Sequence, residues 1–548
     1  MTSLTNLNSG TITVLIGSFI HSISPEDLEI IKTGLIVFHS NGKIIGIEKE
    51  NLTNQECNRK SDLIQRLLKK KWIQKEDVDR LRFIRLRNGE FLLPGFIDTH
   101  THAVQYTNIG VGQQYELLDW LKNVTFLEET KYSSDGYSQR IFEKVVKRLL
   151  NSGTTTCCYF SSIHLSASKV LSQVCFNAGQ RAFIGKCNMD RNETFESYKE
   201  NSVEESIKDT IELIDYIRQH CVPELEKAHR TSIPDHPLKD GSLANSKCVE
   251  TSLSKKEGYS TALVQPILTP RFAISCTDEL LRQLGQLLQS DPSLRLQTHL
   301  SESKSEISFT KSLFPNIGTY TEIYDEFKLL TSRTILAHCI HLEQSEIDLI
   351  KKRECGLSHC PSSNFNLKSG ICKVKRLLQD GIEKIGLGTD VSGGHGIGIL
   401  SCIRDGMIAT KALGFNDHDT PLKETHEIQN SLLSIKNLFY LATLGGAKVC
   451  NLEERIGNFI VGKEFDGIIV QTGVSFDPIE KLEDDELIRF GFEEYQDGCN
   501  PNFFIDEFQK EIQLNDLFEK FLFTGDDRNI ASVFVKGKVV GGARKSLF

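Results

Sequence analysis

Two histidines, His100 and His102, follow a short apolar run over residues 91–93 that is broken at Pro94-Gly95. In an extended segment, residues two positions apart project to the same side. Two imidazoles placed in this way can bind one cation through neutral ring nitrogens, at about 2.0–2.1 Å for zinc. The pair alone is equally compatible with two polar histidines at the end of a strand.

Three later β-rich runs also end in residues that can bind metals or move protons. His299 ends one run and is followed by Glu302, His338 ends the next, and Asp390 follows the last. In a parallel barrel, functional residues gather at the carboxyl ends of the strands. Imidazoles and a carboxylate that leave one position open for water are typical of a catalytic zinc site.

Zinc at such a site lowers the pKa of a bound water from 15.7 to about 7, so proton carriers are needed nearby. Glu302, three residues beyond His299, is our candidate for the carboxylate that transfers protons without binding the metal. Asp390 would take the proton from the water. His338 either binds the metal or orients the attacking oxygen by a hydrogen bond, and the sequence leaves both possibilities open.

The elements that would position these residues alternate along the chain. Helix-length segments over residues 135–151, 167–178, 204–220 and 277–288 separate short β-rich runs, which is the pattern of a parallel sheet. We predict an α/β fold, a (β/α)8 TIM-type barrel. Its eight strands would be 91–97, 154–160, 181–187, 262–268, 294–299, 334–338, 355–359 and 384–387.

Short strands also occur near both ends of the chain, over residues 11–16, 35–47, 465–471 and 531–540. Neither set is large enough for its own core, so we predict one small β-sandwich domain built from both termini. The predicted division is residues 1–90 for its first part, 91–440 for the barrel, and 441–548 for its second part with C-terminal helices. A polar insertion at about 222–258 is expected to be a surface loop. The acidic and aromatic segment 476–515 receives no assignment.

Composition excludes several classes of function. The 548 residues carry a net charge of −9, with 39% hydrophobic and 25% charged residues, as in soluble globular proteins. The only basic block is Lys69-Lys70-Lys71, so we expect no nucleic-acid partner. No apolar run approaches 18 residues, so we expect no membrane span. Fifteen scattered cysteines and a polar N-terminus indicate a reduced, cytoplasmic protein.

Several motifs resemble those of the amidohydrolase superfamily. They lie at residues 94–102, 299–302, 337–338 and 388–390. Finer motifs, at residues 102–106, 269–272, 359–364, 386–394 and 517–529, are similar to those of its guanine deaminases. The resemblance covers nearly the whole chain except residues 1–10, 222–258 and part of 476–515. It implies a homodimer that hydrolyses guanine to xanthine and ammonia on one Zn²⁺ per chain.

The resemblance also implies roles for individual residues. His100, His102, His299 and Asp390 would hold the zinc, and Glu302 would protonate the purine ring as hydroxide attacks C2. Gln105, Arg271 and Phe272 would hold the base, together with the pocket faces of His102, His299, Glu302 and Asp390.

The residue types agree with this assignment. The guanidinium of Arg271 can only donate hydrogen bonds, so it requires an acceptor such as the C6 carbonyl of guanine. Adenine carries a donor amine at that position. Gln105 can donate and accept, and Phe272 can stack on a flat ring.

Other functions remain compatible with these residues. Lys186, with His299, His338 and Asp390, has the ligand types of a binuclear cyclic-amide hydrolase. Another nucleobase or an aromatic amine could be the substrate of a deaminase. A metal-free assembly protein on the same scaffold would show broken ligand positions, and this chain breaks none.

Overall fold

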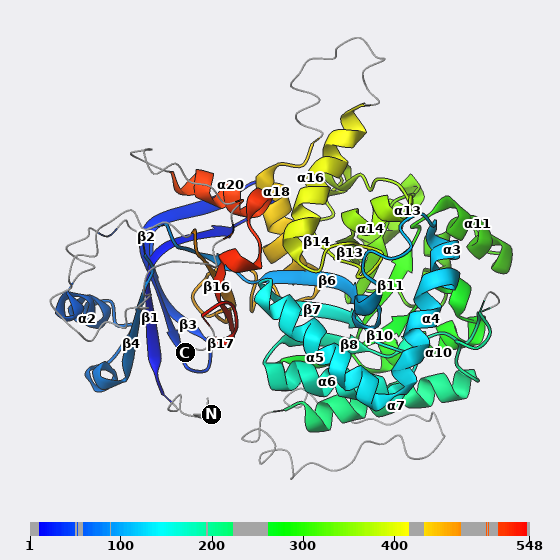
Figure 1. Cartoon of the computed structure of the whole chain (residues 1–548), viewed down its shortest axis with the longest axis horizontal. Helices are drawn as coiled ribbons and strands as arrows, with labels where there is room; N and C mark the ends of the chain where they lie inside the picture. The colour runs from blue at the N-terminus through cyan, green and yellow to red at the C-terminus, as the bar shows by residue number, and fades with distance from the viewer. Residues whose placement is uncertain are drawn as a thin grey trace.

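The computed structural model describes residues 10–49, 52, 59–87, 89–192, 195–222, 261–415, 432–472, 500, 502 and 513–544. The predicted insertion after Val222 and most of the segment 476–515 lie outside the described residues. A β-sheet unit and a barrel lie side by side, with helices α16 (Ile399–Phe415), α18 (Ile435–Tyr440) and α20 (Leu514–Thr524) near their junction (Figure 1).

The barrel confirms the predicted fold class. Its strands pair in parallel in the order β14-β13-β12-β11-β10-β8-β7-β6, and the short β9 (Cys187–Asn188) pairs with β10. Every residue of these strands is buried, as expected for a parallel sheet covered by helices. The strands are β6 (Phe96–His102), β7 (Thr154–Phe160), β8 (Arg181–Gly185), β10 (Val264–Pro270), β11 (Arg295–Leu300), β12 (Thr334–His338), β13 (Gly356–His359) and β14 (Ile385–Leu387).

Hydrogen bonds between β6 and the residues at and after the end of β14 join the two edge strands of this nearly closed barrel. The hydroxyl of Thr99 donates to the carbonyl of Leu387 at 2.9 Å, and the amide of Asp390 donates to the carbonyl of His100 at 2.9 Å. The buried carboxylate of Asp98 accepts hydrogen bonds from the amides of Thr389 and His100, at 3.0 and 3.2 Å. The first and last strands therefore hold their functional ends against each other.

The outer helices follow the predicted alternation. In α5 (Asp135–Asn151), Ser134 caps the first turn and the buried side chains recur with helical spacing. The predicted segments 167–178, 204–220 and 277–288 correspond to α6 (Leu165–Ala178), α7 (Val203–His220) and α10 (Asp278–Ser290). The remaining barrel helices are α11 (Lys304–Leu313), α12 (Tyr320–Glu326), α13 (Gln344–Lys352), α14 (Pro361–Asn366) and α15 (Val374–Gln379).

The smaller unit is an eight-stranded sheet with strands from both ends of the chain, as predicted. Its order is β17-β16-β15-β5-β1-β2-β3, and β4 pairs with β1. Helix α2 (Lys60–Lys69) covers one face, where Leu63 and Leu67 pack with Val14 and Val37. The strands are β1 (Ile12–Ser22), β2 (Leu28–His39), β3 (Ile44–Glu48), β4 (Leu81–Arg85), β5 (Phe91–Pro94), β15 (Gly467–Val470), β16 (Ile530–Val535) and β17 (Lys538–Gly541).

The predicted first barrel strand, 91–97, was wrong in its extent. Residues Phe91–Pro94 form β5 of the small sheet, antiparallel to β15, and the barrel strand begins at Phe96. Gly95 lies between the two strands, and a Cβ there would come within 2.2 Å of the Thr155 hydroxyl. One apolar run therefore serves both units, because the Pro94-Gly95 break lets the chain cross between them.

A helical segment from Ile435 to Val449 lies against the barrel. It consists of α18, the π-helical turn η7 (Leu441–Gly445) and α19 (Gly446–Val449). Its residues Ala447 and Val449 pack with Ile97 and Ile335, near the starts of barrel strands. The predicted divisions fell after residues 90 and 440. Because β5 belongs to the small sheet and this helical segment packs on the barrel, we propose divisions at Gly95 and after Val449 instead. Among the described helices, none combines the length and apolarity needed to cross a bilayer.

Candidate metal and substrate site

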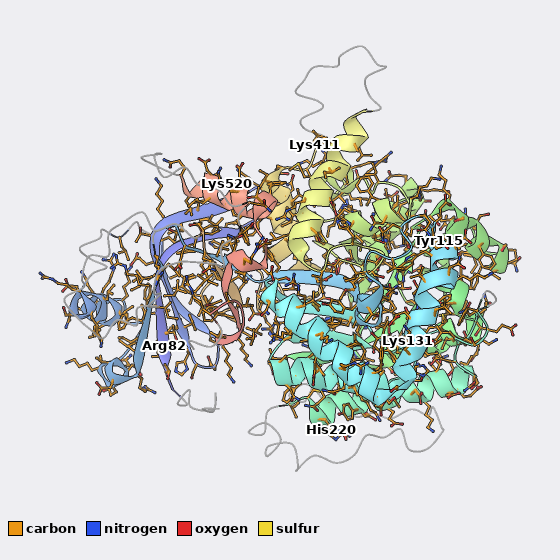
Figure 2. All side chains as sticks on the ribbon, viewed as in Figure 1. Arg82, Tyr115, Lys131, His220, Lys411 and Lys520 are labelled. Atoms are coloured by element: carbon orange, nitrogen blue, oxygen red, sulfur yellow. The ribbon has the colours of Figure 1, made fainter. Side chains whose placement is uncertain are left out.

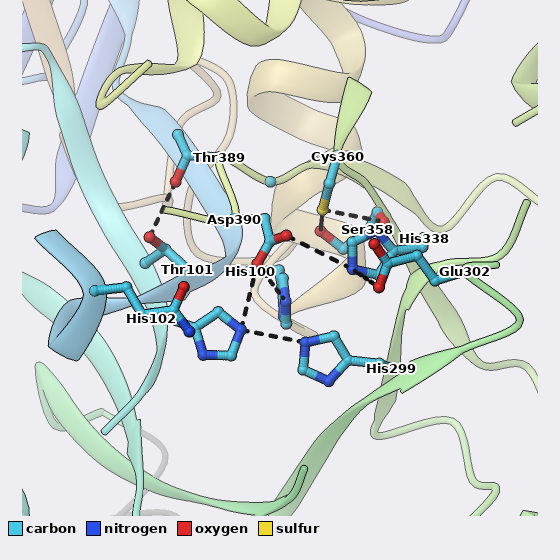
Figure 3. A network of polar contacts seen from close by, with 12 residues as sticks. His100, Thr101, His102, His299, Glu302, His338, Ser358, Cys360, Thr389 and Asp390 are labelled. Carbon is cyan, nitrogen blue, oxygen red and sulfur yellow. Dashed lines mark hydrogen bonds and ion pairs between the residues drawn. The ribbon is translucent and has the colours of Figure 1, made fainter. Parts of the chain in front are cut away.

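Four predicted ligands meet at the carboxyl ends of the barrel strands. One nitrogen or oxygen atom from each of His100, His102, His299 and Asp390 lies within 4.8 Å of the others, and all four residues are buried. Asp390 Oδ1 is 3.3 Å from Nε2 of both His100 and His102, and the Nε2 atoms of His102 and His299 are 3.2 Å apart. Figure 3 shows these three rings and the carboxylate converging on one point.

The surroundings prepare these imidazoles to bind a metal. Nδ1 of His100 is 3.2 Å from the side-chain oxygen of Gln297, and Nδ1 of His299 contacts the carbonyl of Arg271. Donation from Nδ1 leaves the Nε2 lone pairs directed at one another, an arrangement that a shared cation stabilises. Burial lowers the pKa of His100 to about 4 and that of His299 well below its usual value, so both rings are neutral.

His100 Nε2 is buried and has no hydrogen-bond partner among the described atoms. A buried nitrogen without a partner is costly, and a metal ion would satisfy it. Nitrogen and oxygen donors of these types suit a divalent ion such as zinc. The four residues therefore fit a metal, and within the described part of the chain they form the only such group.

Backbone strain marks the same strand ends. Ser301, His338 and Asp390 have φ angles of 51°, 70° and 45°, in the left-handed region that non-glycine residues rarely adopt. Such conformations cost roughly 1–3 kcal/mol each and cluster at functional sites. The hydrogen bond from the Asp390 amide to His100 helps to hold one of them.

Gly388 lies beside this cluster at the end of β14. A Cβ at this position would lie 2.5 Å from Ser358 Oγ, 2.9 Å from Cys360 Sγ and 3.0 Å from the Cβ of His100. Only glycine therefore lets the chain pass this close to the His100 side chain.

Glu302 and His338 lie next to the four ligands without belonging to the group. Oε2 of Glu302 is 3.4 Å from Nε2 of His338, which is 3.8 Å from Oδ2 of Asp390. Asn364 Oδ1 contacts Nδ1 of His338 at 2.9 Å, and the hydroxyl of Ser369 donates to Glu302 at 3.1 Å. His338 thus lies between the carboxylates of Glu302 and Asp390, and the contact of Nδ1 with Asn364 fixes the orientation of its ring.

Their electrostatics suit proton transfer. Burial raises the pKa of Glu302 to about 7. Burial would lower the pKa of His338, but the charges of Glu302 and Asp390 raise it overall. A carboxyl with a pKa of about 7 thus faces an imidazole whose pKa is raised, and a pair of proton-exchanging groups is what general acid–base catalysis requires.

A pocket opens onto this arrangement. Its polar lining consists of His102, Gln105, Arg271, His299, Glu302 and Asp390. Its apolar lining consists of Leu117, Trp120, Leu121, Phe272 and Leu367. The structure therefore brings the predicted substrate-binding residues Gln105, Arg271 and Phe272 to one pocket.

The sequence interpretation missed Trp120 and Glu129, which lie between β6 and α5. This connection contains η2 (Ala103–Asn108), α3 (Leu117–Trp120), η3 (Leu121–Thr125), α4 (Phe126–Glu129) and η4 (Thr130–Ser133). Tyr115, labelled in Figure 2, precedes α3 and packs against the apolar cluster that includes Trp120. The length of this connection could have indicated functional residues, because long loops at the carboxyl ends of barrel strands often contribute residues to the active site.

Lys186 has a different environment from the one that a binuclear site requires. Its ammonium forms a buried ion pair with Glu200 and donates to the carbonyl of Cys187 at 3.3 Å. It is not part of the ligand group among the described residues. The geometry thus gives no support to the cyclic-amide hydrolase interpretation.

A family model described as "Amidohydrolase family" matches residues 91–540. The chain belongs to the amidohydrolase family.

Relatives of this amidohydrolase match over almost the full length. It is 38% identical over 526 residues to the guanine deaminase of Dictyostelium discoideum, covering 96% of this chain and 97% of the relative. It is 34% identical over 524 residues to that of Homo sapiens, covering 96% and 95%. A crystal structure of guanine deaminase from C. acetobutylicum with guanine in its active site superposes with a TM-score of 0.69 at 28% identity, covering 97% and 99%.

Proposed function

We propose that this amidohydrolase uses one zinc ion to hydrolyse guanine to xanthine and ammonia. The observation that carries the proposal is the place of Glu302, whose carboxyl lines the pocket beside the four-ligand cluster without belonging to it. Hydrolytic deamination needs a metal site that activates water and a separate group that transfers protons. The names of the relatives supply the substrate.

His100, His102, His299 and Asp390 would hold the zinc. When bound there, zinc makes a water molecule acidic enough to act as a nucleophile at neutral pH. Asp390 has its Oδ1 directed at the histidines and its Oδ2 toward His338, so Oδ2 is the atom that takes a proton from the attacking water.

Glu302 donates a proton to N3 of the purine as the water oxygen attacks C2. A carboxyl with a pKa of about 7 can both give and take a proton at neutral pH. The hydroxyl on C2 then loses its proton, the amine gains one, and ammonia leaves. Of the two water protons, one ends on N3 of xanthine and the other on ammonia.

His338 orients these transfers in our proposal and does not bind the metal. Its Nε2 faces Glu302 and Asp390, and Asn364 fixes its ring. From this position it can hold a proton between the two carboxylates during the reaction.

The pocket walls recognise the base. Arg271 donates hydrogen bonds to the C6 carbonyl of guanine, and Gln105 adds a second polar contact. Phe272 and Trp120 supply apolar faces for a flat ring. Adenine would place a donor amine against the donors of Arg271, which leaves both without partners.

We also propose that the enzyme is a cytoplasmic homodimer. The twelve cysteines among the described residues are free and buried, which supports a reducing compartment. Light scattering after size exclusion, which should give twice the chain mass, tests the dimer.

The function is tested by incubating the purified protein with guanine and following both the absorbance change and ammonia release. Adenine, cytosine, 8-oxoguanine, dihydrouracil and hydantoin form the comparison panel. We expect guanine to be the preferred substrate. Preferential turnover of hydantoin or dihydrouracil would support a cyclic-amide hydrolase, and a preference for another base would change the assigned substrate.

A further inference from the structure

Glu129, at the end of α4, contacts both side chains that we propose to hold the base. Its Oε2 accepts a hydrogen bond from Nη1 of Arg271 at 2.7 Å, and its Oε1 accepts one from Nη2 at 3.1 Å. Oε1 also accepts a hydrogen bond from Nε2 of Gln105 at 2.9 Å. The three residues are at most 3% exposed and come from three separate segments of the chain.

The contact with Arg271 determines the direction of its guanidinium. Two parallel hydrogen bonds between an arginine and a carboxylate fix the guanidinium plane as well as its position. The ring of Phe126 lies 5.1 Å from Cζ of Arg271 and further restricts that plane. Two of the five N–H groups serve Glu129, and the side chain still lines the pocket.

The contact with Gln105 determines which way round its amide lies. Oε1 of Gln105 accepts a hydrogen bond from the amide of Ser392 at 3.0 Å, while its Nε2 donates to Glu129. In a flipped amide, the NH₂ group of Gln105 would face the N–H donor of Ser392, and its oxygen would face the carboxylate acceptor of Glu129. The hydrogen-bonding pattern that Gln105 offers to a ligand is therefore fixed by Glu129 and one backbone group.

Glu129 also balances the charge of the pocket wall. Burial would raise its pKa, but the charge and hydrogen bonds of Arg271 lower it overall, so the carboxylate is ionised. The pair is close to neutral in sum, which suits a neutral base better than an anion. An unpaired buried guanidinium would be costly and free to turn toward other partners.

We propose that Glu129 is a positioning residue that sets recognition of the 6-oxo group of the base, acting through Arg271 and Gln105. This proposal rests on the function proposed above, because it assumes a 6-oxopurine in the pocket. Its consequence is selective: loss of Glu129 should weaken binding of purines that carry the C6 carbonyl and spare those that lack it.

Two inert purines make this selectivity measurable. Hypoxanthine keeps the 6-oxo group and purine lacks it, and neither carries the amine that reacts. For Glu129→Gln, we expect kcat/KM for guanine to fall and the inhibition constant of hypoxanthine to rise, each by about ten- to a hundred-fold. The inhibition constant of purine should change less than about three-fold and the bound zinc should persist. The melting temperature should fall, because the buried guanidinium of Arg271 loses its ionised partner.

Glu128 provides a matched control on the same turn of α4. Its carboxylate accepts hydrogen bonds from Lys131 and from the hydroxyls of Thr107 and Tyr137, and it does not contact Arg271. Glu128→Gln should leave the three constants unchanged. If Glu129→Gln does not fold, Glu129→Asp keeps the charge but shortens the side chain, and the same selective loss is expected.

A double mutant separates positioning from general damage. Because Glu129 acts chiefly through Arg271, adding Glu129→Gln to Arg271→Met should cost little further kcat/KM. Equal losses for hypoxanthine and purine, or fully additive losses in the double mutant, would overturn the proposal. If the wild-type protein does not deaminate guanine at all, the proposed function itself fails; guanine turnover without selectivity in Glu129→Gln overturns only this inference.

Discussion

Oε2 of Glu302 lies 3.4 Å from Nε2 of His338, and both side chains are buried. The charge of Glu302 raises the pKa of His338, the imidazole lowers the pKa of Glu302 against the larger effect of burial, and Asp390 lies on the far side of the imidazole. Glu302 and His338 would therefore move protons without holding the metal, whereas Asp390 would do both.

Replacing Glu302 by glutamine should therefore remove turnover without removing the metal. The amide has a similar shape but cannot carry the proton, and general acid–base catalysis typically contributes about 10²–10⁴-fold. Steady-state kinetics and metal analysis on the same preparation check this prediction. Loss of the metal together with activity would identify Glu302 as a ligand.

His100→Ala or Asp390→Ala should remove most of the bound zinc and all turnover, because three remaining ligands leave the site under-coordinated. Elemental analysis of the wild-type protein should give close to one zinc per chain. Two metals per chain, with a mass shift on Lys186, would instead support the binuclear alternative.

Gly388→Ala should weaken zinc binding although residue 388 is not a ligand. The added Cβ would approach the Cβ of His100 to 3.0 Å and Ser358 Oγ to 2.5 Å, so β6 and β14 must shift apart. Gly136→Ala is the matched control, because no atom lies within 4 Å of the added Cβ in helix α5. Zinc affinity measured by chelator competition should fall only for Gly388→Ala, and equal affinities would remove the steric argument.

Arg271→Met should retain zinc while kcat/KM for guanine falls about ten- to a hundred-fold, since a hydrogen bond from a charged donor contributes roughly 1.5–3 kcal/mol. The exposed Arg282, changed in the same way, serves as the control. Unchanged kcat/KM in Arg271→Met, or wild-type turnover of adenine equal to that of guanine, would remove Arg271 from substrate recognition.

His21 should make the fold sensitive to acid. Burial lowers its pKa to about 4 although Glu29 opposes the shift, and the ring accepts a hydrogen bond from the Phe459 amide. Below its usual pKa of 6.5, the unfolded chain binds a proton that the folded chain does not. The contribution of His21 to the free energy of unfolding is therefore fully present above pH 6.5. It is lost as the pH drops toward 4, and the loss is on the order of 3 kcal/mol.

Thermal unfolding at pH 7.5 and pH 5.0 measures this loss. His21→Asn keeps an acceptor near the Phe459 amide but does not titrate, so its melting temperature should depend less on pH than that of the wild type. The same pH dependence in both proteins would contradict the assignment.

Much of this architecture could be predicted from the sequence, because periodic hydrophobic runs indicate the strands and helices locally. The strand over residues 154–160 and the helix over 135–151 match the structure in both bounds, since each is a periodic run with clear ends. The run 91–97 was predicted as one strand because it is one apolar segment, but it contributes to two sheets. Only the packing of Gly95 on Thr155 shows where the first strand ends and the second begins.

The same distinction applies to the site. The ligands were predictable because parallel strands bring their carboxyl ends together, so polar residues at those ends must meet. Glu129 was not, because it lies in an irregular connection and its partner Arg271 is 142 residues away. Its pairing depends on tertiary packing, which spacing along the chain does not encode.

Turnover of guanine in H₂¹⁸O measures whether a water oxygen replaces the C2 amine at the four-ligand cluster. Mass spectrometry of the purine product should show xanthine with one ¹⁸O per molecule and one ammonia released for each, and His100→Ala should yield neither. Xanthine without the label would show that the oxygen does not come from water, and release of ammonia at an undiminished rate by His100→Ala would show that the four-ligand cluster is not where the amine is replaced.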